Sequence, residues 1–370
     1  MKIFLKTFLI IILLKGSVLA ETFNSALKRA YETNPELNAE REILNISEQE
    51  LKISKSSYLP TVTITGSKNE QETDKLTNRD GSDASIVDVD TSTQTITVTQ
   101  TLIDFGRGAE LKKSKIGIDL AKANLLKKEQ EILYKAVDAY SSLVVAQEKF
   151  KINNSNVNLL DRQVETDRIQ LERGKITLSD VAQSESALAE AQAKLISAEN
   201  DVFTSRLNYE NIIGELNNVD SLDKKINFEL NLPKELSKAI ELSRKNNPDL
   251  IIAKLEHEQS KKDTVSARSD LAPSASLSFD RSKTDDLSST YDKREKDVLE
   301  ATVTWPFFSG GKNYANLNKS KSLELQKSLL LDNMTKKNQT NVASAWSNYQ
   351  SNKSLLNSVR AQVNAAEIAN

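Results

Sequence analysis

The fold follows from residues 132–164, which read ILYKAVDAYSSLVVAQEKFKINNSNVNLLDRQV. Side chains on one face recur at alternating intervals of four and three residues, which is the heptad pattern of a coiled-coil helix. This stripe is apolar except at one position: Ile132, Ala136, Ala139, Leu143, Ala146, Phe150, Asn153, Val157, Leu160 and Val164. The pattern predicts one arm of a long helical hairpin.

Residues 181–209 carry a matching pattern and predict the second arm. The heptad column is Val181, Leu188, Leu195, Val202 and Tyr209, and a column of small residues beside it is Ser184, Ala191, Ala198 and Ser205. Small side chains let neighbouring backbones approach closely, so this helix is expected to have neighbours on two sides. The whole hairpin is predicted over 109–213, and each arm would be far longer than a helix in an ordinary globular protein.

The turn between the two arms has its own signals. Gly174 can adopt the left-handed conformation that ends a helix. Thr177 followed by Asp180 supplies an N-cap and an acid three positions later for the next helix. Two interpretations stay open here: these residues are helix caps alone, or the turn also contacts another protein, with Arg173 and Lys175 pairing with acids across it.

The composition excludes several functional classes. The 370 residues include 50 Lys and Arg against 52 Asp and Glu, so the charge does not point to nucleic acid as a partner. Cysteine is absent, and His257 is the single histidine, whereas a metal site needs three or four ligands. There is no nucleophile elbow, metal-binding motif or glycine-rich phosphate loop. We therefore expect no catalytic residue, no metal and no cofactor, and the chain is not expected to be an enzyme.

The first twenty residues have the features of a secretory signal peptide. Lys2 and Lys6 precede an apolar run over 8–14, and Val18 and Ala20 are small residues at the positions that a signal peptidase reads. We expect residues 1–20 to be removed on export.

Two copies of one unit are visible beyond that segment. Asn34-Pro35-Glu36-Leu37 corresponds to Asn247-Pro248-Asp249-Leu250, and Pro60 corresponds to Pro273, both at an offset of 213 residues. A constant offset over two prolines and their flanks indicates an internal duplication. The predicted repeats are residues 21–220 and 221–370, each with helices that a proline ends, followed by a pair of strands.

The predicted strands are 61–69, 92–102, 274–283 and 297–305, where Thr or Ser alternates with apolar residues. An open sheet in lipid would leave the amides and carbonyls of its edges unsatisfied, so only a closed barrel avoids that cost. Four strands are too few for a barrel, and three copies would supply twelve. The Thr and Ser side would line water. The apolar side would face lipid through Val62, Ile64, Ile96, Val98, Leu277, Val303 and Trp305.

Each pair of strands is expected to continue into a long helix, the second one over 312–370. By the repeat, the second hairpin turn would fall near position 380. We therefore expect a C-terminal portion, with the second turn and its returning helix, to be missing from this sequence.

Several motifs together make the chain similar to the TolC family of outer-membrane efflux proteins. These motifs are the duplicated Asn-Pro-acid-Leu, the strand exit Asp104-Phe105-Gly106 with Phe308-Ser309-Gly310-Gly311, and the turn 174–181. The resemblance covers residues 22–370. It implies an α+β membrane protein: a homotrimer whose twelve strands form an outer-membrane β-barrel and whose hairpins form a periplasmic α-barrel.

The resemblance also implies a function and partners. The chain would be the outer-membrane exit duct of a tripartite efflux pump or a type I secretion system. It would dock to a periplasmic adaptor, also called a membrane fusion protein, and to an inner-membrane RND or ABC transporter. The adaptor contact implied for the periplasmic tip involves Arg173, Gly174, Lys175, Thr177, Asp180 and Val181.

Two other classes of protein stay open at this point. A periplasmic coiled-coil adaptor would also contain a long hairpin, but usually a single one flanked by β-rich domains, whereas here the hairpin-plus-strand unit is duplicated. An envelope hydrolase is the third class, and no motif supports it.

Overall fold

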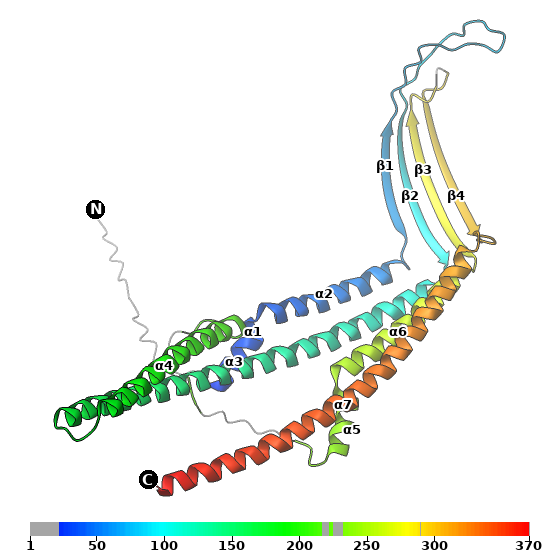
Figure 1. Ribbon diagram of the computed structural model, residues 1–370. Coiled ribbons are helices and arrows are strands. Elements are labelled where there is room, and N and C mark those ends of the chain that lie inside the picture. Colours follow the sequence, from blue (N-terminus) through cyan, green and yellow to red (C-terminus); the bar gives the residue numbers. More distant parts are fainter. Residues whose placement is uncertain (1–21, 217–221, 225–231, 289, 370) are drawn as a thin grey trace, which may run out of the picture. The chain divides into compact units, whose positions relative to one another are not determined.

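The computed structural model describes residues 22–216, 222–224, 232–288 and 290–369. The signal peptide expected at 1–20 lies outside these ranges. The elements in chain order are α1 Phe23–Thr33, α2 Pro35–Ser56, β1 Thr61–Lys68, β2 Ser92–Ile103, α3 Arg107–Glu172, α4 Leu178–Ile212, α5 Leu236–Asn246, α6 Pro248–Ser269, β3 Ser274–Asp285, β4 Lys293–Thr304 and α7 Lys312–Ala369 (Figure 1). The order helix, helix, strand, strand, long helix occurs twice, which confirms the two-repeat architecture.

The prolines end helices where the sequence predicts. Asn34 follows the last residue of α1, and its side-chain Oδ1 accepts hydrogen bonds from the backbone N–H groups of Glu36 and Leu37 at the start of α2. In the second repeat, Asn247 caps α6 through the N–H of Asp249. A proline at the first helical position loses no hydrogen bond, because that N–H has no partner within the helix.

The four strands form one antiparallel sheet in the order β1-β2-β3-β4 (Figure 1). Val62 lies opposite Val98, and Phe279 lies opposite both Val98 and Leu299. Two strand boundaries differ from the prediction by two residues or more: β3 continues to Asp285, and β4 begins at Lys293. The alternation of apolar and polar residues stops where these strands become charged, yet backbone pairing continues.

Residue contacts divide the chain into two compact units, Met1–Arg41 with Leu126–Leu232, and Glu42–Leu125 with Pro233–Asn370. The first unit contains the hairpin, in which α4 runs back along the distal part of α3 (Figure 1). Its core lies near the base of α4. Phe23 of α1 packs edge-on against Tyr140 of α3 with ring centroids 5.3 Å apart, and Tyr140 lies next to Tyr209 of α4. All three side chains are buried.

The second unit contains the sheet and α5 to α7. Polar contacts join α6 to α7: Lys327 Nζ lies 2.8 Å from Glu256 Oε2, and Thr264 Oγ1 donates to Glu324 Oε2 at 2.7 Å. A stripe of apolar residues is therefore not the only means by which these long helices pair. Among the described residues, every helix is too short or too polar to cross a lipid bilayer.

Candidate functional site

One face of the sheet is apolar over much of its area. In an antiparallel sheet, residues directly opposite each other project from the same face. Val62 with Val98 and Ile64 with Ile96 therefore share a face, and the pairing of Val98 with Phe279 extends that face onto β3. Four of these side chains are exposed rather than packed in a core, Ile64 by 75%, and Val98 is half-buried. The apolar face is thus available to a medium or a partner outside this chain.

The opposite face of the sheet is polar. Its β1 and β2 positions are all threonine or serine: Thr61, Thr63, Thr65, Ser67, Thr93, Thr95, Thr97, Thr99 and Thr101. On β3 this face carries Asp280, whose Oδ1 accepts a hydrogen bond of 2.6 Å from Thr97 Oγ1. The two faces of one sheet therefore suit two different media, one apolar and one aqueous.

The structure brings six of the seven predicted lipid-facing residues onto one face. Leu277 lies opposite Ala301 and Val303 lies opposite Ala275, two residues apart along each strand, so both belong to the apolar face. The seventh, Trp305, follows the last residue of β4, so the predicted strand end at 305 is wrong by one residue. The indole Nε1 of Trp305 donates a hydrogen bond to the backbone carbonyl of Leu271 at 3.2 Å.

Sequence reasoning missed two residues of this face. Phe279 and Leu299 lie opposite each other between the pairs that contain Leu277 and Arg281. The signal was present in the sequence, since Phe279 follows Leu277 by two residues and Leu299 precedes Val303 by four. A strict period-two reading of these strands would have included both.

The sheet has two edges among the described residues. β1 pairs only with β2, and β4 pairs only with β3, in the part of the chain that the structure describes. The outer N–H and C=O groups of these two strands can pair with strands of another chain. Edges of eight and twelve residues could pair over the whole length of a neighbouring strand.

The hairpin tip is a compact turn held by its own backbone. Gly174 has φ of +68°, and the N–H of Lys175 donates to the carbonyl of Gln170 at 2.9 Å. Thr177 and Asp180 form a reciprocal capping box. The backbone N–H and the hydroxyl of Thr177 both donate to Asp180 Oδ2 at 2.8 Å, and they hold the pKa of this carboxyl below its usual value.

The predicted tip residues do not all have the same environment. Arg173, Lys175 and Thr177 are exposed, as a contact site requires. Val181 is 5% exposed, so it packs inside the hairpin and is not available to a partner. Leu178 is 72% exposed, and the sequence prediction omitted it. An apolar residue at the first position of a helix after a capping threonine was the available signal.

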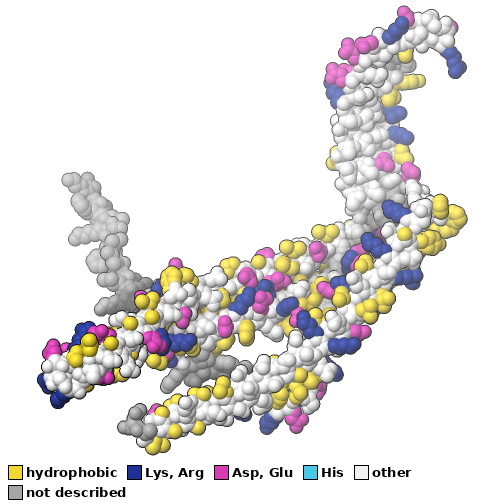
Figure 2. Space-filling view, in the orientation of Figure 1, with side chains coloured by type: hydrophobic (Ala, Val, Ile, Leu, Met, Phe, Trp, Pro, Cys, Tyr) yellow, Lys and Arg dark blue, Asp and Glu magenta, His cyan; other side chains and the backbone are white. Residues whose placement is uncertain are grey.

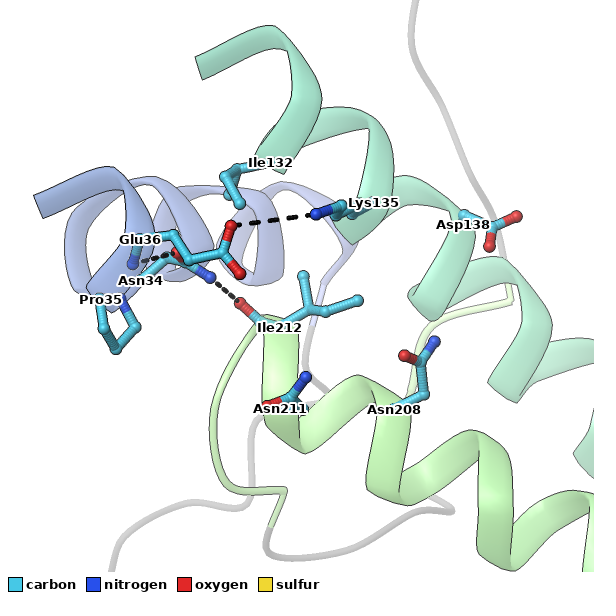
Figure 3. Close-up of a pocket in the computed structure, with 9 residues that line it drawn as sticks. All are labelled: Asn34, Pro35, Glu36, Ile132, Lys135, Asp138, Asn208, Asn211 and Ile212. Atoms are coloured by element: carbon cyan, nitrogen blue, oxygen red, sulfur yellow. Dashed lines mark hydrogen bonds and ion pairs between the residues drawn. The ribbon is translucent and has the colours of Figure 1, made fainter. Parts of the chain in front are cut away.

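A polar cleft of about 520 Å³ lies at the base of the hairpin (Figure 3). Its lining residues are Asn34, Pro35, Glu36, Ile132, Lys135, Asp138, Asn208, Asn211 and Ile212. Asn34 Nδ2 donates to the carbonyl of Ile212 at 3.1 Å, and Lys135 Nζ lies 3.9 Å from Glu36 Oε2. Asn34 thus holds α4 to the break between α1 and α2, and we assign the cleft a structural role.

The first joint between the sheet and a long helix is held by Arg107, the first residue of α3. Its guanidinium donates to three backbone carbonyls, those of Ser57, Thr101 and Leu102, at 3.0–3.1 Å. It also lies 4.8 Å from the centroid of the Tyr58 ring. Asp104 Oδ1 accepts from the N–H of Gly106 at 2.7 Å and caps the helix.

The second joint uses different side chains. The Trp305 indole binds the Leu271 carbonyl, and Asn313 Nδ2 donates to the carbonyl of Asp270 at 2.8 Å. Trp305 also contacts Phe307 edge-on, with ring centroids 5.5 Å apart. Figure 2 shows the hydrophobic side chains that gather where β4 gives way to α7. Both joints connect a strand pair to a long helix.

The described residues hold no group of three or more histidine, aspartate, glutamate or cysteine side chains that could bind a metal ion. His257 of α6 borders a small cavity with Lys321, Glu324 and Ser328 of α7. The cavity brings His257 close to a basic residue, Lys321, and an acidic residue, Glu324, and these three do not form a set of metal ligands.

Comparison with known proteins identifies relatives over nearly the whole chain. The family model described as outer membrane efflux protein matches residues 26–215 and 239–369. The outer membrane efflux protein BepC of Brucella suis biovar 1 is 26% identical over 367 residues, covering 97% of this chain and 77% of BepC. The proteases secretion protein PrtF of Dickeya chrysanthemi is 21% identical over 329 residues, covering 87% of this chain and 71% of PrtF.

Solved structures agree with the fold. The outer-membrane channel OprN superposes with a TM-score of 0.74 at 19% sequence identity, covering 91% of this chain and 76% of OprN. At this level of identity the likeness concerns the fold alone, and it includes both the long helices and the strands.

Proposed function

The chain belongs to the outer membrane efflux protein family, and from this premise we propose that it is the exit duct through which an envelope export system passes its substrates to the exterior. It is a protein of the outer membrane whose helices lie in the periplasm. One relative is named for efflux and another for the secretion of proteases, so both a tripartite efflux pump and a type I secretion system are supported.

The observation that carries this proposal is the two-sided sheet. An exposed apolar face and a threonine-rich face on the same four strands fit a wall between lipid and water. The unpaired outer edges of β1 and β4 must find partners in a membrane, because unsatisfied backbone groups are too costly in hydrocarbon. Three copies joined edge to edge would close a barrel of twelve strands.

The hairpins support the same assembly. On α4 a second stripe, Ala182, Ala189, Ile196 and Phe203, is exposed beside the buried one. We propose that neighbouring protomers cover this stripe and thus form a helical tunnel in the periplasm. The division into repeats at residues 21–220 and 221–370 is part of the same proposal, since each repeat would supply two strands and one hairpin.

We assign the hairpin tip to the contact with a periplasmic adaptor, and through it to an inner-membrane RND or ABC transporter. Arg173, Gly174, Lys175, Thr177, Asp180 and the exposed Leu178 form the proposed contact surface, with Val181 supporting it from inside. No step of this function requires catalysis. The alternative that this chain is itself a periplasmic adaptor is no longer supported, because the match to the outer membrane efflux protein family covers both halves of the duplicated chain.

The test is native mass spectrometry of the protein extracted from outer membranes in mild detergent, followed by conductance in planar bilayers. We expect a trimer that conducts. A non-conducting monomer in the soluble periplasmic fraction would overturn the proposal.

A paired variant tests the face assignment. Replacing Val62 and Ile64 together with Asp should prevent assembly, because a charged residue on the lipid face of a barrel costs up to about 2–4 kcal/mol per site, somewhat less for an acid. The matched control replaces Thr63 and Thr65 with Asp on the other face of the same strand, where assembly should proceed. Equal trimer yields from both variants would count against the assignment.

A further inference from the structure

The apolar face of the sheet does not remain apolar as far as the loops. Toward the loop end of β3 and β4, the next three pairs of residues on this face are charged. In each pair, a cationic residue on one strand lies opposite an anionic residue on the other. We call these six residues the charge ladder: Arg281 opposite Asp297, Lys283 opposite Glu295, and Asp285 opposite Lys293. Figure 2 shows that charged side chains gather at the loop end of the strands.

The position of the ladder follows from strand geometry. Arg281 comes two residues after Phe279, so it lies on the same face about 6.8 Å further along the strand. From Arg281 to Asp285 the ladder extends about 13.6 Å. With a strand tilt of about 40°, this length corresponds to a height of about 10 Å along the membrane normal. The polar layer on each side of a hydrocarbon core is about 5–8 Å thick, which is similar.

The cations of the ladder keep free donors. Arg281 Nε lies 3.8 Å from Asp297 Oδ1, and Lys283 Nζ and Lys293 Nζ each lie 3.9 Å from Asp285 Oδ1. These separations are longer than a hydrogen bond. The carboxylates therefore hold the cations in place by charge while the N–H groups can still donate to another oxygen. The three cationic side chains are roughly half exposed or more.

A fourth cation has no acid opposite. Lys68, at the loop end of β1, lies opposite Ser92, in the row that continues across β3 to Asp285 and Lys293. Ion pairing between neighbouring strands would explain the six residues of the ladder, but it does not explain Lys68. A partner outside the chain that carries negative charge explains all four cations.

We propose that the charge ladder and Lys68 form a binding surface for the phosphorylated headgroups of lipids in the outer leaflet. This inference rests on the proposed function, which places the apolar face in lipid and the loop ends outside the cell. Phosphate oxygens accept charge-assisted hydrogen bonds from Arg and Lys. Arg281 lies opposite Ile96, which lies opposite Ile64, so its long side chain would extend from the apolar band toward the headgroups.

The test uses native mass spectrometry of the detergent-purified protein titrated with bisphosphorylated lipid A, and in parallel with the same glycolipid lacking phosphate. The first variant is Lys68→Ser, which breaks no pair between strands. The second is Arg281→Ser combined with Lys283→Ser. The matched control is Arg294→Ser combined with Lys296→Ser, two cations of the same hairpin whose register places them on the opposite face.

We expect wild type to prefer the phosphorylated glycolipid. Each cation near a charged membrane surface changes affinity by about fivefold, so Lys68→Ser should bind about fivefold more weakly and Arg281→Ser/Lys283→Ser more than tenfold more weakly. The control should bind as wild type does. Unchanged affinity of both test variants, an equal loss in the control, or equal binding of the phosphate-free glycolipid would overturn the proposal.

Conductance measurements on the same samples distinguish failure of the proposed function, an exit duct, from failure of the proposed headgroup-binding surface. A wild-type protein that fails to form a conducting oligomer would overturn the proposed function. Variants that conduct normally and keep wild-type affinity for the phosphorylated lipid would overturn the headgroup surface alone. If Arg281→Ser/Lys283→Ser does not assemble, Lys68→Ser still decides the question, since Lys68 lies opposite a serine.

Discussion

At the end of β2, Arg107 alone donates three hydrogen bonds to backbone carbonyls, whereas at the end of β4 Trp305 and Asn313 donate one each. Both joints turn a strand pair into a long helix at the same place in the repeat. The path of the backbone is therefore duplicated while the side chains that hold it are not. At the first joint one arginine makes all three of these bonds to carbonyls, and at the second joint an aromatic residue and an amide make one each.

The largest expected difference comes from removing the central side chain of each joint. Arg107→Ala should destabilise the first joint by about 3 kcal/mol, because three charge-assisted hydrogen bonds disappear together and the part-buried carbonyl of Thr101 loses its donor. Asn313→Ala should cost the second joint about 1 kcal/mol. Hydrogen–deuterium exchange at residues 56–59 and 101–103, compared with 270–272, measures both effects. Similar losses of protection from Arg107→Ala at the first joint and from Asn313→Ala at the second would contradict the expectation that the first joint depends more on a single side chain.

Arg107→Lys is the control for charge. Lys keeps the positive charge but lacks the planar group that reaches several carbonyls at once. Its effect should lie between wild type and Arg107→Ala; an effect equal to wild type would mean that charge alone holds the joint.

The second prediction concerns the close approach at the first joint. A Cβ on Gly106 would lie 2.6 Å from Ser269 Oγ, whereas a Cβ on Gly108 would meet no atom within 4 Å. Gly106→Ala should therefore destabilise the joint by about 1–3 kcal/mol through overpacking, and Gly108→Ala should not. Thermal unfolding followed by circular dichroism compares them. Adding Ser269→Ala should recover most of the loss; no recovery would place the clash elsewhere.

The third prediction compares the two asparagine caps. Asn34 accepts from two backbone N–H groups and donates to Ile212, while Asn247 accepts from one and donates to Asn338 Oδ1 at 2.6 Å. We expect Asn34→Ala to cost about 2 kcal/mol and Asn247→Ala about 1 kcal/mol in stability against urea. Replacement by Asp, which keeps the capping oxygen but not the donor, separates capping from tethering. Equal losses of stability in the two alanine variants would mean that the hydrogen bond from Asn34 to the Ile212 carbonyl adds nothing measurable to stability.

The smallest effect is expected at the hairpin tip, where the cap titrates. The pKa of Asp180 is lowered in the folded protein by the N–H and hydroxyl of Thr177. A lowered folded pKa means that the carboxylate contributes stability above the ordinary pKa of 3.8 and that this contribution is lost as the pH falls through the folded value. The protection factors of the amides of residues 175–181, corrected for the intrinsic pH dependence of exchange, should therefore fall below about pH 4. Asp180→Asn should remove this pH dependence, and an unchanged profile would exclude the capping box as its source.

Much of the fold was predictable from local patterns. The heptad stripe of 132–164, Gly174 at the turn, the capping pair Thr177 and Asp180, and the prolines after Asn34 and Asn247 all appear in the structure in their predicted roles. Each of these signals acts over fewer than eight residues, so a single sequence contains enough information. The alternation within the strands led to a lipid-facing barrel shared by several copies, and the family resemblance added the outer membrane, the periplasmic α-barrel and the partners.

The errors occurred where distant residues decide the outcome. The predicted start of β4 at 297 was late because residues 293–296 are charged, and only pairing with β3 keeps them in the sheet. Val181 belonged to the predicted tip surface, but packing within the hairpin buries it. Trp305 was predicted as the last residue of a strand, but β4 ends at Thr304, and the carbonyl of Leu271 binds the Trp305 indole at the joint.

The periodic elements of this protein could be predicted from the sequence, because helix stripes, strand alternation and caps depend on near neighbours in the chain. The register between β2 and β3, two strands separated by 170 residues of sequence, and the contact of Arg107 with the carbonyl of Ser57, 50 residues away, depend on the tertiary structure. Period two within β3 already places Arg281, Lys283 and Asp285 on the face of Phe279. Only the register between strands places Lys68 and the charges of β4 on that face as well. The proposed headgroup surface and the unequal joints both follow from those long-range pairings.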